Sequence, residues 1–157
     1  MAKAKKEVIS IQNISKIYNL GDTVVKALDD VSLSIFENDF ISITGPSGSG
    51  KSTLAHGLER KLFDRGRVST VLDGKTMRLG ISKDLPHDAE GRAENLRRSA
   101  HIARFLNDSG IICCASFVAP NTDSREHAIS VIGKDNCYII YLNPPIEVCI
   151  QRDPSGL

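Results

Sequence analysis

The residues with the clearest chemical potential are Gly45-Pro46-Ser47-Gly48-Ser49-Gly50-Lys51-Ser52, which match the pattern G-x-x-x-x-G-K-[ST] at every fixed position. An apolar run at 40–44 precedes them, and a helical pattern follows from Ser52 to about Arg65. Glycines let successive backbone N–H groups point into one concavity, and the N-terminus of a helix adds partial positive charge. This arrangement favours a polyphosphate, with Lys51 at the outer phosphates and Ser52 as a ligand of Mg²⁺.

We call residues 45–53, which end at Thr53, the phosphate loop. A glycine-rich turn without a ligand is the alternative interpretation, and the strand and helix patterns on either side weigh against it. The sequence therefore predicts binding of a nucleoside di- or triphosphate, ATP or ADP, together with Mg²⁺.

The pattern of apolar residues predicts the elements that position this loop. Before the loop, alternating apolar and polar residues indicate antiparallel strands at 7–14 and 24–36, with a polar turn at 19–22. After the loop, strand and helix patterns alternate, which predicts an α/β fold with a right-handed, doubly wound parallel sheet. The expected helices lie at about 52–65, 89–107, 122–132 and 145–152, and the expected strands at 68–72, 111–118 and 137–142.

Composition limits the class of protein. With 157 residues, 41% of them hydrophobic, the chain can bury one core, and we expect a single domain over 1–157. Its expected parts are a β segment at 1–44, the phosphate loop at 45–53 and an α/β segment at 54–157. A net charge of +1 favours neither a nucleic-acid nor a membrane partner. Since no long apolar run or signal peptide is present, we expect a cytoplasmic protein.

The four cysteines are Cys113, Cys114, Cys137 and Cys149, and no two of them form a C-x-x-C pair. A zinc site usually has such paired spacing. We therefore expect reduced, buried thiols that behave as small hydrophobic side chains.

Residues 7–54 resemble the start of an ABC-transporter ATPase of the kind that energises lipoprotein or macrolide export. The segment ISIQNISKIYNLGDTVVKALDDVSLSIFENDFISITGPSGSGKSTL carries this resemblance. It implies that Tyr18 stacks on the adenine of ATP and that Val25 lines the same pocket. The alternative for Tyr18 is an aromatic side chain at a strand edge that packs on the core.

From about Ser49 to the last residue, the chain instead resembles the adenylylsulfate (APS) kinases. The matching segments, in order, are GSGKSTLAHGLERKL, VLDGKTMRLGISKDL, RAENLRRSAHIARFLNDSG, CCASFVAP and PPIEVCIQRDPSGL. The two resemblances together predict a fusion, natural or engineered, joined inside the phosphate loop. They imply a P-loop NTPase fold with a three-layer parallel sheet, preceded by antiparallel strands of the ABC type.

Asp73 is the predicted catalytic carboxylate, acting with Lys51. It follows a strand beside the phosphate loop, where it can hold Mg²⁺ or accept a hydroxyl proton, although an ordinary turn before Gly74 is the alternative. In APS kinases the motif usually reads Asp-Gly-Asp-Asn, whereas here it reads Asp-Gly-Lys-Thr. The charge of Lys75 is therefore expected to disfavour a metal and to put the catalytic base in doubt.

The same resemblance implies residues that bind the acceptor, adenylylsulfate. Arginine forks suit its oxyanions, and Arg98 is a weaker candidate for such a contact. His87 stands where the family has a phenylalanine that stacks on the acceptor adenine. Arg152 resembles the start of the lid that closes over ATP. The implied acceptor contacts are Arg78, Arg92, Asn95, Ser116, Phe117 and Val118.

Two functions follow from these patterns. ABC-type transport is not expected, because no glutamine loop, Leu-Ser-Gly-Gly-Gln signature or switch histidine follows Leu54. The chain ends at Leu157, where APS kinases continue into the lid, so we expect nucleotide binding with little or no turnover. The alternative is an active ATP-dependent APS kinase, a homodimer as members of that family commonly are. In either case Tyr18 is expected to replace a missing adenine contact.

Overall fold

The computed structural model describes residues 6–20, 23–119 and 121–153, without the side chains of residues 16–29. Contacts within the chain group it into two compact units, Met1–Glu37 and Asn38–Leu157, and each is described by itself. The expectation of one domain over 1–157 stays a prediction. Within the described residues, no helix has both the length and the apolar character needed to span a membrane.

The first unit is an antiparallel hairpin of β1 (Glu7–Leu20) and β2 (Thr23–Phe36). Strand β2 lies close to its predicted bounds, whereas β1 extends beyond the predicted end at residue 14. Strand β1 continues because its pairing with β2 shifts register without breaking off. Asn13 and Asp30 have positive φ angles of 50° and 51°, and Asn13 Nδ2 donates to Asp30 Oδ1 at 2.8 Å. Asn and Asp tolerate this left-handed conformation. The places where the pairing of β1 and β2 shifts register are therefore β-bulges.

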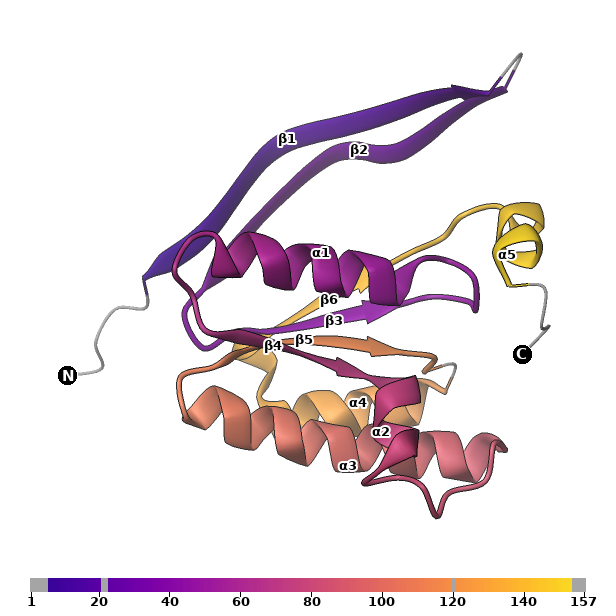
Figure 1. Ribbon diagram of the computed structural model, residues 1–157. Coiled ribbons are helices and arrows are strands. Elements are labelled where there is room, and N and C mark those ends of the chain that lie inside the picture. Colours follow the sequence, from indigo (N-terminus) through magenta and orange to yellow (C-terminus); the bar gives the residue numbers. More distant parts are fainter. Residues whose placement is uncertain (1–5, 21–22, 120, 154–157) are drawn as a thin grey trace. The chain divides into compact units, whose positions relative to one another are not determined.

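The second unit is built on a four-stranded parallel sheet with the order β4-β5-β3-β6. Helix α1 covers one face of the sheet, and α3 and α4 cover the other (Figure 1). These are the three layers of a P-loop NTPase fold, as predicted. The strands are β3 (Phe40–Thr44), β4 (Ser69–Asp73), β5 (Ile112–Phe117) and β6 (Cys137–Tyr141). The helices are α1 (Lys51–Phe63), α2 (Gly74–Leu79), α3 (Ala89–Asp108), α4 (Thr122–Ile132), a 3₁₀ turn (Lys134–Asn136) and α5 (Ile146–Arg152).

Helix α2 is the element that the sequence patterns did not predict. It has six residues and opens with glycine, so it is too short for a hydrophobic period to reveal. Its start depends on Asp73, whose side chain accepts a hydrogen bond from the backbone N–H of Lys75 at 2.8 Å and so caps the helix. The Asp-Gly-Lys-Thr stretch is therefore a helix start and not only a turn.

The core of the second unit lies between the sheet and helices α3 and α4. Strand β5 is buried along its whole length because neighbouring strands flank it and helices cover it. The cysteines are free; Cys113, Cys114 and Cys149 are buried, as predicted, and Cys137 is half-buried. Burial raises the pKa of Cys114 to about 12 and that of Cys137 to about 11, so both thiols stay protonated at neutral pH.

Candidate active site

The phosphate loop joins β3 to α1, and its shape requires glycine. Gly45, Gly48 and Gly50 have φ angles of +150°, +75° and +89°, which side chains of L residues rarely allow. A Cβ on Gly45 would lie 2.5 Å from the carbonyl oxygen of Leu142, and one on Gly48 would strike that of Cys149. The loop is therefore packed against the segment that follows β6, and its backbone conformation is fixed from that side.

Lys51 opens α1 and lies across the loop. Its Nζ donates to the carbonyl oxygens of Gly45 at 3.0 Å and Pro46 at 2.6 Å, and the residue is only 8% exposed. Burial lowers the pKa of Lys51, while the charge of Asp73 acts in the opposite direction. An ammonium group with so little hydration gains from a nearby polyanion, which is the property expected of the lysine in this motif.

Three oxygen-bearing side chains from different elements meet beside the loop. Ser52 Oγ, in the first turn of α1, donates to Asp73 Oδ2 at the end of β4 at 2.5 Å. It lies 3.3 Å from Ser116 Oγ near the end of β5. Ser52 and Asp73 are the residues predicted to hold Mg²⁺, and a hydroxyl paired with a carboxylate fits the preference of Mg²⁺ for oxygen ligands.

Asp73 is 7% exposed and held as a carboxylate. Burial is the largest single influence and raises its pKa, but hydrogen bonds from Ser52, the Lys75 N–H and Ser116 outweigh it. The pKa of Asp73 is therefore lowered from its ordinary value. The side chain of Lys75 is exposed, and its backbone N–H is the group that bonds Asp73.

Arg78 and Asn95, two predicted acceptor contacts, each leave a buried polar atom without a partner among the described residues. One terminal nitrogen of Arg78 donates to the carbonyl oxygens of Leu85 at 2.9 Å and Pro86 at 3.0 Å, while the other has no partner. Asn95 Nδ2 donates to the carbonyl oxygen of Gly74 at 3.3 Å, and its Oδ1 has no partner. A ligand that supplied these bonds would remove the penalty for burying such atoms.

Arg92 and Val118 lie farther along the same side of the sheet. Both line a hollow between α3 and the segment after β5, with Ala89, Ala93, Leu96, Ala119, Asn121 and Ser124. Phe117, by contrast, is a core residue: it is 6% exposed, and a Cβ on Gly74 would lie 3.0 Å from its ring. Ser116, Phe117 and Val118 were all predicted to contact the acceptor, but the structure places them apart. Ser116 lies beside Ser52 and Asp73, Phe117 lies in the core, and Val118 lines the hollow.

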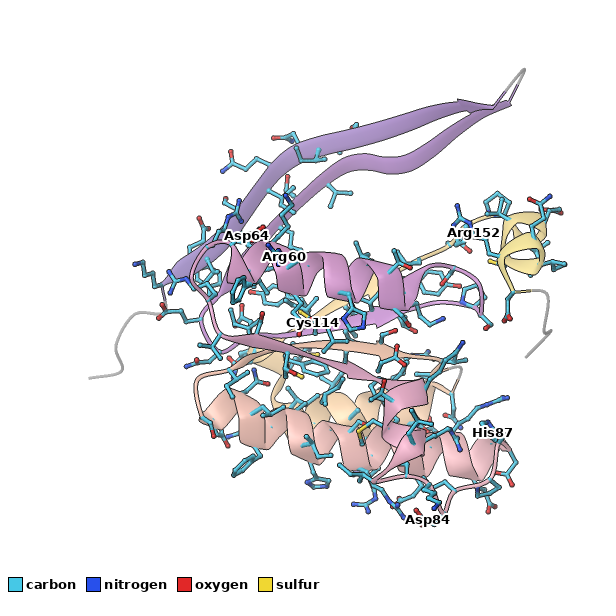
Figure 2. The ribbon with its side chains drawn as sticks, in the orientation of Figure 1. Arg60, Asp64, Asp84, His87, Cys114 and Arg152 are labelled. Atoms are coloured by element: carbon cyan, nitrogen blue, oxygen red, sulfur yellow. The ribbon has the colours of Figure 1, made fainter. Side chains whose placement is uncertain are left out.

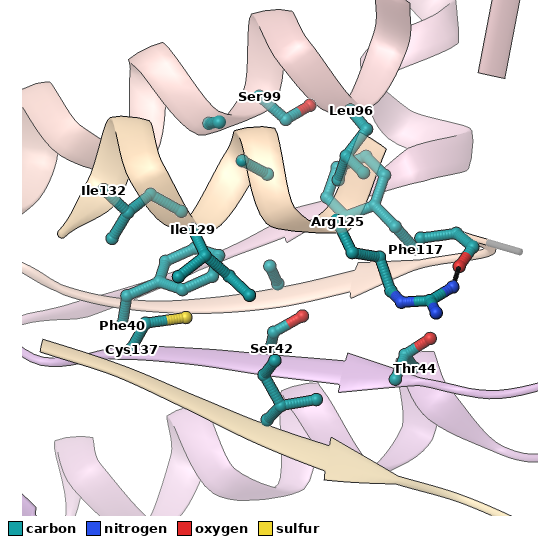
Figure 3. Close-up of a pocket in the computed structure, with 15 residues that line it drawn as sticks. Phe40, Ser42, Thr44, Leu96, Ser99, Phe117, Arg125, Ile129, Ile132 and Cys137 are labelled. Carbon is teal, nitrogen blue, oxygen red and sulfur yellow. Dashed lines mark hydrogen bonds between the residues drawn. The ribbon is translucent and has the colours of Figure 1, made fainter. Parts of the chain in front are cut away.

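A second cavity lies between β3, β5 and β6 on one side and α3 and α4 on the other (Figure 3). Its walls are mainly apolar, and Arg125 is the charged residue among those that line it. The terminal nitrogens of Arg125 donate to the carbonyl oxygen of Ala119 at 2.6 Å and to Thr122 Oγ1 at 2.8 Å. Arg125 thus fastens the segment that carries Val118, a role that sequence reasoning missed because it depends on the path of that segment.

The remaining predicted site residues lie elsewhere. Arg152 is exposed at the end of α5, and His87 lies in the segment before α3 (Figure 2). Arg98 is engaged with carboxylates of the protein. Tyr18 and Val25 face each other in the register of β1 and β2, and their side chains lie outside the described residues. The predicted adenine contacts therefore stay predictions.

Comparison with known proteins agrees with this arrangement. The family of adenylylsulphate kinases matches residues 37–157. The adenylyl-sulfate kinase of Bacteroides thetaiotaomicron is 42% identical over 141 residues, which are 90% of this chain and 70% of that protein. The bifunctional enzyme CysN/CysC of Rhodopirellula baltica is 47% identical over 116 residues, and the chain spans 18% of that protein. The structure of the Mycobacterium tuberculosis APS kinase CysC in complex with AMPPNP and APS matches with a TM-score of 0.72 and 36% identity, over 76% of this chain and 70% of that one.

The predicted ABC-transporter portion, and with it the fusion, finds no support in these comparisons. The Bacteroides relative alone matches 90% of the chain. The Gly-Ser-Gly-Lys-Ser-Thr sequence serves phosphate binding in many proteins, and two alternating strands are compatible with many folds. With residues 37–157 matched by the family and the loop, Ser52 and Asp73 in place, the chain belongs to the adenylylsulphate kinase family.

Proposed function

We propose that this protein transfers the γ-phosphoryl group of ATP to the 3′-hydroxyl of adenylylsulfate. The observation that carries the proposal is the meeting of Ser52, Asp73 and Ser116 at the phosphate loop, in a chain whose family is that of the APS kinases. The alternative, nucleotide binding with little or no turnover, has no observation in its favour. We therefore propose an active enzyme in preference to a nucleotide-binding protein with little or no turnover.

Binding of the nucleotide is assigned to the phosphate loop. The backbone of Gly45 to Thr53 cradles the phosphates, and Lys51 exchanges its bonds to loop carbonyls for bonds to phosphate oxygens. Ser52 and Asp73 would hold Mg²⁺, which would neutralise charge that develops on the phosphate oxygens. The side chain of Lys75 is exposed, and its backbone N–H is the group that bonds Asp73.

Asp73 is assigned a second role, which is to interact with the attacking hydroxyl of the acceptor. Its lowered pKa keeps it ionised at neutral pH, and an ionised carboxylate can accept a hydrogen bond from the attacking hydroxyl. Arg78 and Asn95 have the unpartnered polar atoms needed to orient an acceptor that carries both anionic and hydrogen-bonding groups. Arg92 and Val118 extend this surface along the hollow between α3 and the segment after β5.

A further nucleotide contact and an assembly are also proposed. Arg152, at the end of α5, is proposed to approach the nucleotide. A homodimer is the proposed assembly, and a hexameric APS kinase of Thiobacillus denitrificans, with 30% identity and a TM-score of 0.53 over 66% of this chain, shows that oligomers occur among related structures.

A coupled assay of ADP release tests the proposal. The wild-type protein should release ADP from Mg·ATP at a rate that depends on adenylylsulfate and saturates with it, whereas AMP should not replace the acceptor. Asp73→Asn should lower the rate by a factor of at least about 100, because it removes both a metal ligand and a hydroxyl acceptor. Binding of Mg·ATP by calorimetry with no acceptor-dependent turnover would instead favour the alternative.

A further inference from the structure

The segment 80–88, which joins α2 to α3, connects the residues proposed to bind the acceptor. Arg78 lies just before it, and Arg92 and Asn95 follow it on α3. Apart from Ser82, which is buried, and Leu85, which is half-buried, the residues of this segment are exposed. A segment with so few buried apolar side chains keeps its shape chiefly through polar bonds.

Arg98, on α3, supplies side-chain bonds that tie the first half of the segment to this helix. Its two terminal nitrogens donate to the two carboxylate oxygens of Asp84 at 2.6 Å and 2.8 Å. One of them also donates to the carbonyl oxygen of Ile81 at 2.7 Å, and Nε donates to Glu94 at 2.9 Å. All three nitrogens are thus engaged within the protein, and the paired bonds to Asp84 need the planar fork of arginine.

The second half of the segment is held by Arg78 and Gly91. Arg78 binds the carbonyl oxygens of Leu85 and Pro86 with one terminal nitrogen, which leaves the other buried and without a partner among the described residues. A Cβ on Gly91 would strike the carbonyl oxygen of Pro86, so this oxygen rests directly on helix α3. The position of the Arg78 guanidinium therefore depends on the positions of the Leu85 and Pro86 carbonyl oxygens in this segment.

From these contacts we infer that Arg98 is a positioning residue for the acceptor: by fixing segment 80–88 on α3 through Asp84 and Ile81, it sets the direction in which Arg78 presents its unpartnered nitrogen. The inference rests on the proposed function, since it concerns the same site. Arg98 does not contact the acceptor. Its effect reaches the acceptor through Leu85, Pro86 and Arg78.

The inference predicts a selective kinetic effect. In Arg98→Lys the charge remains but the paired bonds to Asp84 do not, so the KM for adenylylsulfate should rise between about tenfold and a hundredfold, as a displaced contact residue does. The KM for ATP should change less than about twofold, because the phosphate loop is built by other elements. Asp84→Asn should act in the same direction, and the double variant should be little worse than either single variant.

Arg97→Gln is the matched control. Arg97 is a neighbouring arginine on the same helix, and its bonds to Glu94, at 2.6 Å and 2.9 Å, do not reach segment 80–88. This variant should keep both KM values within about twofold of the wild type. An equal rise in the KM for adenylylsulfate in Arg97→Gln and Arg98→Lys would overturn the inference, because disturbing either of the two arginines that bond Glu94 would then be enough to explain it.

Amide hydrogen exchange of the free protein gives a readout that does not need turnover. In Arg98→Lys, the amides of Ser82, Lys83 and Leu85, which bond within the segment and to Met77, should exchange at least about fivefold faster, and those of α1 should not. Unchanged exchange at these amides would refute the inference even if the enzyme is active. A wild-type protein without APS-dependent turnover would instead overturn the proposed function, and the acceptor role of Arg98 with it.

Discussion

Replacing Gly48 by alanine should damage the phosphate loop in two separable ways. The φ angle of +75° makes the left-handed conformation unfavourable for alanine, which costs about 1–2 kcal/mol. The added Cβ also strikes the carbonyl oxygen of Cys149, and relief of such overpacking typically costs about 1–3 kcal/mol. We expect the free energy of unfolding to fall by about 3 kcal/mol, and the Kd for Mg·ATP to rise at least about tenfold because the loop or α5 must move.

Two further glycines provide matched controls for this prediction. Gly66 has a φ of +69° and open space around its Cβ position, so Gly66→Ala should show the backbone penalty alone, about 1 kcal/mol. Gly57 lies inside α1, also with open space, and Gly57→Ala should stabilise the protein by about 0.5–1 kcal/mol. Neither variant should change the Kd for Mg·ATP.

Urea unfolding gives the free energies and titration calorimetry gives the Kd values. The reasoning predicts the stability order Gly57→Ala, wild type, Gly66→Ala, Gly48→Ala, from most to least stable. If Gly48→Ala were as stable as Gly66→Ala and bound Mg·ATP as the wild type does, the packing of the segment after β6 against the loop would be refuted.

The remaining predictions concern the titrating groups of the second unit. Asp73 has a lowered pKa in the folded protein, so its contribution to stability is present above the unfolded pKa of about 4 and is lost as the pH falls through the lower, folded pKa. Asp73→Asn should therefore be less stable than the wild type by about 1–2 kcal/mol at pH 7, and urea unfolding from pH 7 to pH 2 should show this difference vanish; a constant difference would contradict it. The thiols of Cys113, Cys114 and Cys149 are buried, so in the native protein a thiol reagent should modify Cys137 first, and all four only after unfolding. Mass spectrometry of the labelled peptides checks this order, and rapid labelling of Cys113 in the folded protein would contradict it.

The parts of the fold that follow from local pattern were predictable. A helix was predicted near 122–132 and is observed at Thr122–Ile132, where Asn121 caps its start and Gly133 follows its end. The almost wholly apolar run at 111–118 likewise predicted a strand that neighbouring strands flank and helices cover. The phosphate loop was predicted because its chemistry depends on residues that are adjacent in sequence.

The parts that depend on how distant segments meet were not predictable. Helix α2 begins only because the side chain of Asp73 turns back to its N–H groups, and six residues show no period. Arg98 was predicted as a contact of the acceptor, and its bond to Asp84, 14 positions away in the sequence, could not be read from the pattern. The resemblance of residues 7–54 to ABC-transporter ATPases finds no support in the comparisons, because a likeness confined to one segment does not establish where that segment comes from.

Direct detection of the transferred phosphoryl group tests the central claim best. We would incubate the protein with Mg·ATP labelled at the γ-phosphate and with adenylylsulfate, and analyse the nucleotides by mass spectrometry. The account predicts that the wild type adds one labelled phosphoryl group to adenylylsulfate at its 3′-hydroxyl, and that Lys51→Ala does not. If the folded protein bound Mg·ATP and adenylylsulfate and the label remained on ATP or passed only to water, the claim would be contradicted.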